Sequence, residues 1–368
     1  MLNGVLNNSY WDREKGASVA LIPDPVFNKD EIVKVPTIYD IAKQANLKTG
    51  GIVWPATRGA KTLDWTVPDV FSDALFQTYG TASLLAEFKA AKIPYEMQEK
   101  WCRQGDGGVP RDRMYAQMTG HVIRQHKPNL MLLHLVEVDH VNHQKGPRSP
   151  ESYEAVAFDD ERVKEVWEAA KETFPGRATV IVVSDHGFMP YWQSIQPNVL
   201  LRKDGLVKME GAKVTARQAW ALGQFIYVLD KSQRKELVKK LAEEFRKVEG
   251  VESVVEEKDF AKFGLVTQDV DSRMPNLIIN PKEGYTTSDT ATGDLVVTAK
   301  SDSMKGAHGH DPGHKLMQGT FVAWGAGIRK GAKVGEINNV DVAPTIARLL
   351  GLEMKNVEGH PLEAILVK

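Results

Sequence analysis

Short apolar runs alternate along the chain with longer stretches in which apolar residues recur every three or four positions. The runs predict strands, and each one ends just before polar or glycine-rich residues: Thr49 to Val53, Leu130 to Leu135 and Ala178 to Val183. The amphipathic stretches predict helices at Thr37 to Ala45, Ser83 to Lys92, Ser152 to Thr173 and Val340 to Leu350, the last of which should end at Gly351. This alternation favours an α/β fold, in which a mostly parallel sheet is sandwiched by helices.

The pattern changes to an α+β type between about residues 215 and 299. Strands are predicted at "QFIYVLD", "ESVVEE" and "NLIINP", and Ser232 is expected to cap a helix that presents an apolar stripe up to Gly250. We therefore predict two parts. Residues 1–214 and 300–368 would form the α/β domain, and residues 215–299 a small inserted α+β lobe.

Composition and charge exclude several classes of protein. The 368 residues are 42% hydrophobic and 26% charged, which is typical of globular chains. A net charge of -1 gives no electrostatic reason to expect a nucleic acid polymer as partner. The single cysteine, Cys102, excludes an internal disulfide. No stretch is apolar for the length that a membrane span needs, and the amino terminus lacks the basic and apolar segments of an export signal.

Candidate chemistry follows the predicted strands. "HLVEVDHVNHQKGP" places Asp139 and His143 four residues apart after the second strand, and "SDHG" places Asp185 and His186 after the third. "GAHGHDPGH" adds His308 after the lobe. Ligands gather at the carboxyl ends of parallel strands, and imidazole and carboxylate groups suit zinc. The sequence therefore predicts a metal site, with Gly187 letting the backbone turn away from the ion.

Two acidic residues on the long helix between these motifs have a simpler interpretation. Asp159 and Asp160 are adjacent, and the pattern predicts that both lie on a solvated helix face.

The three metal motifs, in this order and interrupted by a lobe, resemble those of the nucleotide pyrophosphatase/phosphodiesterase branch of the alkaline phosphatase superfamily. The match continues in "NGVLNNSYWD", in "WPATRGAKTLDWTVPD" and in "NNVDVAPTIARLLGL", so it covers nearly the whole chain. The resemblance implies two divalent ions, expected to be zinc. Asp139, His143 and His308 would hold one ion, while Asp185 and His186 would be ligands of the other.

The resemblance also implies hydrolysis of a phosphodiester or phosphoanhydride in a small molecule or nucleotide. Asn8 matches an asparagine that donates a hydrogen bond to a phosphoryl oxygen, although a turn role is the alternative interpretation. Trp54 and Phe71 fall where the family places aromatic rings near the nucleotide, and ordinary packing is the alternative for both.

The sequence departs from the family pattern before Asn8. Family members carry a metal-binding Asp and a Thr or Ser nucleophile upstream of this element, on a strand inside the sheet, and this chain shows neither residue. The favoured explanation is a truncated start. We expect the chain as given to bind one zinc ion well and the second poorly, with weak or absent hydrolysis.

Other interpretations stay open. A phosphomonoesterase or a sulfatase could use the same fold, although Cys102 lies in no sulfatase-like motif. A non-catalytic metal-binding relative is the alternative from another class. Family members are usually extracytoplasmic, but neither the localisation nor the oligomeric state of this chain is predicted.

Overall fold

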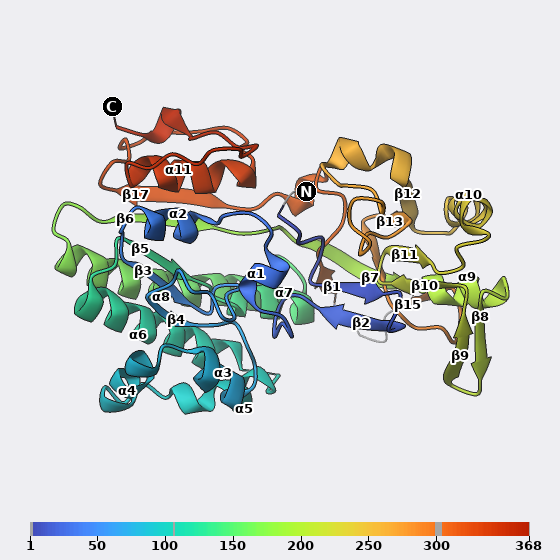
Figure 1. Ribbon diagram of the computed structural model, residues 1–368, viewed down its shortest axis with the longest axis horizontal. Coiled ribbons are helices and arrows are strands. Elements are labelled where there is room, and N and C mark those ends of the chain that lie inside the picture. The colour runs from blue at the N-terminus through green and yellow to red at the C-terminus, as the bar shows by residue number, and fades with distance from the viewer. Residues whose placement is uncertain (1–2, 106, 299–303, 368) are drawn as a thin grey trace.

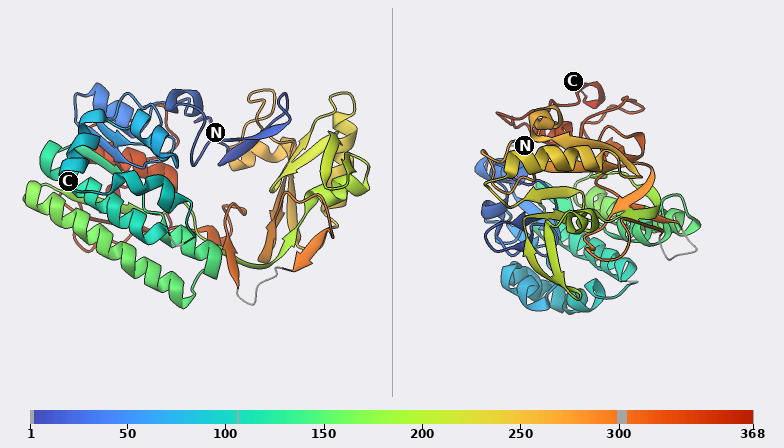
Figure 2. Two further views of the ribbon diagram at one scale, coloured as in Figure 1. Left: turned by 90° about the horizontal axis from the view of Figure 1, so that it is seen from below. Right: turned by 90° about the vertical axis from the view of Figure 1, so that its right-hand side faces the viewer.

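The protein has two parts that lie side by side, an α/β body and a mostly antiparallel lobe (Figure 1, Figure 2). This computed structural model describes residues 3–105, 107–298 and 304–367. The predicted boundary between residues 299 and 300 lies outside the described residues. The predicted division of the chain into two domains stays a prediction.

The body contains a small parallel sheet and a separate antiparallel pair. Strand β3 (Thr49–Ile52) lies between β4 (Trp65–Val67) and β5 (Leu130–Leu133), and all three are parallel. Strand β6 (Thr179–Val183) pairs antiparallel with β17 (Phe321–Gly325). The three predicted strands are confirmed. A mostly parallel sheet is correct only in part, because the pairing is divided among several short sheets.

Helices cover the body on two sides (Figure 1). Helix α6 (Gly108–His126) packs against α8 (Pro150–Thr173) and contacts β3 and β5. On the other side α2 (Ile38–Gln44) contacts α11 (Val342–Leu349). The side chain of Thr37 caps α2, and Gly351 follows α11 with φ of 71°. The predicted helices are thus confirmed to within about two residues, including α4 (Ala82–Ala90).

Short elements complete the chain. They are α1 (Lys29–Ile32), α3 (Asp73–Tyr79), α5 (Gln98–Cys102), α9 (Pro197–Lys203), β8 (Val207–Glu210) and β9 (Lys213–Arg217). No helix within the described residues combines the length and the apolarity needed to cross a bilayer.

The prediction of a solvated Asp159 is wrong. Its exposed fraction is 8%, and the buried residues of α8 recur at helical spacing along one face, which includes Ser152, Ala155 and Arg162. This face packs on α6 and on α7 (Glu137–Lys145). Because the buried face carries polar residues, a search for apolar periodicity does not find it.

The lobe is built on a four-stranded sheet in the order β10 (Ala219–Leu222), β11 (Phe225–Val228), β13 (Leu277–Pro281), β12 (Val251–Glu256). Helix α10 (Arg234–Phe245) packs its apolar stripe against it. Ser232 is not the cap of α10, because the cap position is Gln233 and both the backbone N and the Oγ of Ser232 donate to Asp230.

The core of the lobe extends to segments far away in the sequence. Trp11, from the hairpin of β1 (Ser9–Asp12) and β2 (Ala17–Ala20), is buried in the same apolar cluster as the lobe's sheet. The Arg13 guanidinium fastens this hairpin, since it donates to the carbonyl oxygens of Ser272 and Met274. The amino-terminal hairpin therefore packs with the lobe.

Strand β7 (Met189–Ile195) continues from the "SDHG" motif of the body into the lobe. It pairs with β14 (Gly284–Thr287), β15 (Val296–Thr298) and β16 (Lys305–Ala307). In the antiparallel register with β16, Ala307 lies opposite Met189. Because β16 runs back along β7, it brings His308 beside His186, which lies just before β7.

Candidate metal centre

Helix α7 positions Asp139 and His143 on one face, because residues four apart on a helix are neighbours. The His143 Nε2 lies 3.6 Å from the Asp139 Oδ2. The start of the helix is anchored to α6, since the backbone N–H groups of Val136 and Glu137 donate to the buried carboxylate of Asp112 over 2.8 and 2.7 Å. The helix end that carries Asp139 is therefore tied to the body.

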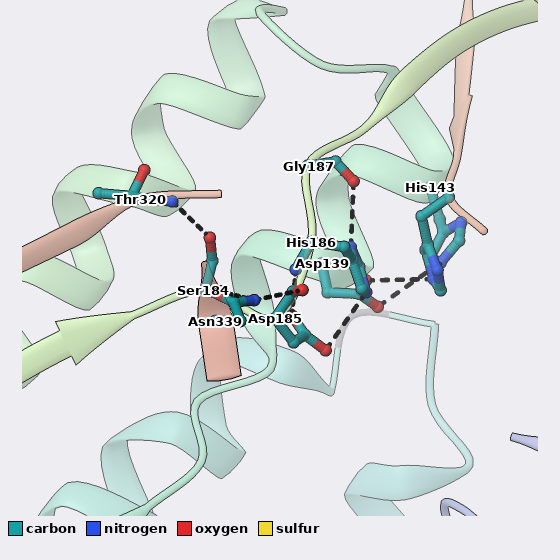
Figure 3. Close-up of polar contacts among 9 residues, drawn as sticks. Asp139, His143, Ser184, Asp185, His186, Gly187, Thr320 and Asn339 are labelled. Atoms are coloured by element: carbon teal, nitrogen blue, oxygen red, sulfur yellow. Dashed lines mark hydrogen bonds and ion pairs between the residues drawn. The ribbon is translucent and has the colours of Figure 1, made fainter. Parts of the chain in front are cut away.

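The loop after β6 is held from both sides (Figure 3). Ser184 donates its backbone N–H to the Thr320 carbonyl, and its Oγ accepts from the Thr320 N–H over 2.7 Å. The Asn339 side chain donates to the Asp185 carbonyl over 3.0 Å. These bonds fix the backbone that presents Asp185 and His186.

Gly187 is needed at this loop for a reason other than the expected one. A Cβ at this position would lie 2.2 Å from the carbonyl oxygen of Leu316, and the Gly187 N–H donates to the Met317 carbonyl over 2.9 Å. The absence of a side chain therefore lets the backbone at Leu316 pack against this loop. The sequence had instead predicted that the glycine turns the backbone away from the ion.

Histidine and carboxylate groups from the three predicted motifs converge at this point. His308 Nε2 lies 3.1 Å from His143 Nε2 and 3.7 Å from Asp139 Oδ1. His186 Nε2 lies 3.3 Å from Asp185 Oδ2 and 4.0 Å from Asp139 Oδ1. The rings of His186 and His308 stack with centroids 3.7 Å apart. Asp139 thus lies between the two predicted ligand groups.

Hydrogen bonds set the tautomers of two of the histidines. The Nδ1 of His143 is 3.0 Å from the Gly306 carbonyl, and the Nδ1 of His186 is 3.0 Å from the Gly187 carbonyl. A carbonyl only accepts, so Nδ1 carries the proton in each neutral ring and the Nε2 lone pair faces the cluster. Burial, and then the neighbouring His186 and His143, lower the pKa of His308 to about 3. At pH 7 that imidazole is neutral, as a metal ligand must be.

These donors fit a divalent ion of the zinc type. One ligand atom each from Asp139, His186 and His308 lies within 4.8 Å of the others. Ligand atoms around tetrahedral zinc are about 3.3 Å apart, given bond lengths of about 2.0–2.1 Å. The separations of 3.1 and 3.7 Å around His308 lie on either side of that value.

Two residues around the cluster, Phe188 and His134, were not predicted from the sequence. Phe188 presents its ring to three imidazoles, with centroids 5.0 Å from His143, 5.5 Å from His186 and 5.3 Å from His308. The pattern offered no signal for it, because a phenylalanine after a strand is ordinary core. His134, at the carboxyl end of β5, is also nearby: burial lowers its pKa, while the carboxylates of Asp185 and Asp139 act in the opposite direction.

The predicted substrate residues have other neighbours. Asn8 is exposed, and its carbonyl accepts from the backbone of Leu21 and Ile22 in the amino-terminal hairpin. Trp54 packs on the apolar cluster that joins α2 and α11. Phe71 is half-buried, and its backbone N–H donates to Asp24. Their roles toward a substrate stay predictions.

Solved structures with the same fold are enzymes of the alkaline phosphatase superfamily and their relatives. An inactive murine ectonucleotide pyrophosphatase/phosphodiesterase 5 in complex with AMP is 16% identical, with a TM-score of 0.70 over 100% of this chain and 84% of that chain. The alkaline phosphatase PafA is 14% identical, with a TM-score of 0.70 over 100% of this chain and 86% of that chain. At these identities the likeness shows the fold alone, which is alkaline phosphatase-like α/β.

A more distant structural relative is the phosphonoacetate hydrolase from Sinorhizobium meliloti 1021 in complex with phosphonoacetate. It is 17% identical, with a TM-score of 0.57 over 88% of this chain and 74% of that chain. No curated protein matches the sequence. Residues 2–311 match the type I phosphodiesterase / nucleotide pyrophosphatase family. With its fold, its cluster of histidines and carboxylates and this match over most of its length, the chain belongs to the type I phosphodiesterase / nucleotide pyrophosphatase family of hydrolases.

Proposed function

We propose that this protein is a metal-dependent hydrolase of phosphodiester or phosphoanhydride bonds. Asp139, His143 and His308 would hold one divalent ion, and Asp185 and His186 would contribute to a second. The observation that carries the proposal is the 3.1 Å approach of two Nε2 atoms, on His143 and His308, with the other nitrogen of His143 bound to a carbonyl. Two imidazole nitrogens held this close suit a shared cation.

The chain's own residues would orient the ligands and leave one side open. Two such cations, when bound, neutralise the charge that develops on a phosphoryl group and on a leaving oxygen. The carbonyls of Gly306 and Gly187 hold the imidazole rings, and Asn339 holds the loop of Asp185. The Asp185 side chain is 79% exposed, so a substrate can approach the cluster from its side.

We further propose a nucleotide or another small phosphodiester as substrate. The murine relative with the same fold was solved with AMP. Asn8 would donate to a phosphoryl oxygen, and the rings of Trp54 and Phe71 would lie near a base. These three roles rest on the family resemblance of their motifs.

Hydrolysis by this chain alone is proposed to be slow. Ser184 is the hydroxyl residue next to Asp185, but Figure 3 shows its side chain directed at Thr320. The Ser184 Oγ accepts a hydrogen bond from the backbone N–H of Thr320. A hydroxyl engaged in this way is poorly placed to attack phosphorus. The proposed metal site therefore has no attacking side chain in that position.

Zinc content measured by elemental analysis tests the metal site. We expect at least one zinc per chain at the proposed site, and His308→Ala should weaken binding there by at least about 10–100-fold, the loss typical even for outer partners of a ligand. His360→Ala is the matched control, because His360 is an exposed histidine outside the cluster. Equal zinc content and affinity in all three proteins would overturn the assignment of His308.

Turnover of three nitrophenyl esters tests the reaction. We expect slow, zinc-dependent turnover that is faster for the phosphodiester than for the phosphomonoester or the sulfate ester. Faster hydrolysis of the monoester or the sulfate ester would instead indicate the corresponding esterase. Zinc bound at the site without any turnover would indicate a non-catalytic relative.

A further inference from the structure

A second group of potential ligands lies on the outer helices of the body, apart from the residues proposed above. Glu87, on α4, has its Oε2 2.8 Å from the Nε2 of His121 and 2.8 Å from the Nε2 of His126, both on α6. One ligand atom from each of the three residues lies within 4.8 Å of the others. In Figure 1, α4 lies at the lower left of the molecule, whereas α7 lies near its centre.

The two imidazole rings are held by aromatic neighbours. Trp65 stacks on His126 with centroids 4.5 Å apart and an interplanar angle of 20°. Phe88 contacts the ring of His121 at its edge, with centroids 5.6 Å apart. The side chains of His121 and His126 are only 16% and 18% exposed. The rings are therefore placed before any ligand binds, which lowers the entropic cost of binding.

The donor set is that of a zinc-type site. Two imidazole nitrogens and one carboxylate oxygen are the three protein ligands of many zinc sites that keep a fourth position open. The two separations of 2.8 Å would need to widen by about 0.5 Å to reach the spacing of tetrahedral zinc ligands, given bond lengths of about 2.0–2.1 Å. The Glu87 side chain, which is 31% exposed, is the partner that would rotate to provide this.

The surroundings leave room for a fourth ligand. His121 also lines a surface hollow of about 350 Å³, together with Gln117 and Arg124. Water can therefore reach this side of the cluster. Lys92 and Arg124 both carry positive charges beside this hollow, and the charge of Arg124 is partly offset because its Nε is 3.1 Å from the Glu172 carboxylate.

An ion pair is the competing interpretation. Glu87 could serve only to accept hydrogen bonds from two histidines; burial raises its pKa, and the bonds from His121 and His126 outweigh burial and lower it. The same geometry, a carboxylate oxygen 2.8 Å from two ring nitrogens, also suits a cation when both rings turn a lone pair toward it. Binding measurements distinguish the two interpretations.

We propose that Glu87, His121 and His126 form a separate binding site for a divalent transition-metal ion of the zinc class, which ties α4 to α6. The site is independent of the proposed hydrolytic centre, because the two share no residue. It needs neither a phosphate substrate nor turnover.

The test is a titration with Co²⁺, read by visible absorption, in the full chain carrying Asp139→Ala and His308→Ala. These changes remove ligands of the proposed hydrolytic centre only. We expect about one remaining equivalent of Co²⁺, with the absorption of a low-coordinate ion that has nitrogen ligands. Adding His126→Gln should weaken that binding by about tenfold or more, whereas His360→Gln should not change it. No saturable binding, or binding unaffected by His126→Gln, would overturn the proposal.

A second measurement uses the unaltered protein, so it does not depend on whether a variant folds. Crystals of the unaltered protein exposed to zinc should show an anomalous diffraction peak between Glu87, His121 and His126. No peak there, with the three side chains in direct contact, would show an ion pair and overturn the proposal. A peak there is informative whether or not His308→Ala alters zinc binding at the other site, so failure of one proposal does not imply failure of the other.

Discussion

The tightest backbone approach beside the candidate metal centre is made by a single residue, Gly187. Its carbonyl holds the ring of His186, and its Cα faces the carbonyl oxygen of Leu316. The glycine therefore joins a candidate ligand to a segment that arrives from more than 120 residues further along the chain. Any side chain here must displace either the ligand loop or that segment.

Gly187→Ala tests this contact. The added Cβ would lie 2.2 Å from a backbone oxygen, so the loop must shift. We expect a loss of about 1–3 kcal/mol in the free energy of unfolding, the usual cost of overpacking, and weaker zinc binding because His186 moves. Urea unfolding and zinc titration measure the two effects. Gly335→Ala is the control, since a Cβ there meets nothing within 4 Å; similar effects from both substitutions would contradict this explanation.

At the scale of elements, the junction of α6, α7 and α8 is organised by two buried acids. Asp112 on α6 accepts the first N–H groups of α7, and Asp159 on α8 lies against it. Burial raises the pKa of Asp112 well above its usual range, and the adjacent Asp159 raises it further. Burial likewise raises the pKa of Asp159 to about 6. The pair holds a proton more tightly in the folded protein than in the unfolded chain.

This pair predicts that folding stability depends on pH. The pKa of Asp159 is about 6 in the folded protein and 3.8 ordinarily, so the folded state binds this proton more tightly. The resulting stabilisation is fully present below about pH 3.8 and is lost as the pH rises through 6. Asp159→Asn removes the titrating group. Its stability relative to the unaltered protein should therefore improve by about 1–3 kcal/mol between pH 4 and pH 7. Asp160→Asn, at the exposed next position, is the control. Denaturant unfolding at several pH values decides, and a pH-independent difference for Asp159→Asn would contradict the prediction.

At the scale of the whole molecule, the candidate metal centre joins segments on either side of the lobe. Asp139 and His186 precede the lobe in the chain, and His308 follows it after β16 has paired with β7. A bound ion would therefore fasten the end of the lobe to the body. Because an ion binds only where these segments meet, it stabilises the folded state over the unfolded one.

Removal of metal should show this coupling. At a zinc concentration about 100 times its Kd, binding contributes about 2.7 kcal/mol, so a chelator should lower the Tm by several degrees. The shift should be smaller in His308→Ala, in which only the proposed site of Glu87, His121 and His126 remains intact, and it should persist in part in His126→Gln, which leaves this centre intact. Differential scanning calorimetry measures it, and an identical shift in His308→Ala would show that the stabilising ion lies elsewhere.

Local features of this protein follow from the sequence with little ambiguity. Strands β3, β5 and β6 and helices α2, α8 and α11 lie close to their predicted ranges, because apolar periodicity and capping residues such as Thr37 act over a few neighbouring positions. The spacing of Asp139 and His143 and the adjacency of Asp185 and His186 are local in the same sense. The family and the candidate ligands could therefore be predicted from these short motifs and their order along the chain.

The arrangement that makes those residues one cluster depends on long-range contacts, which only the tertiary structure decided. The antiparallel pairing of β6 with β17, the return of His308 through β16 and the backbone contact at Gly187 all join distant segments. The burial of Asp159 and the meeting of Glu87 with His121 and His126 are of the same kind. Two histidines five residues apart point about 140° apart around a helix, so spacing alone does not bring them together. The sequence determines which groups can bind or titrate, and packing determines which of them meet, because strand edges and helix faces choose their partners across the whole chain.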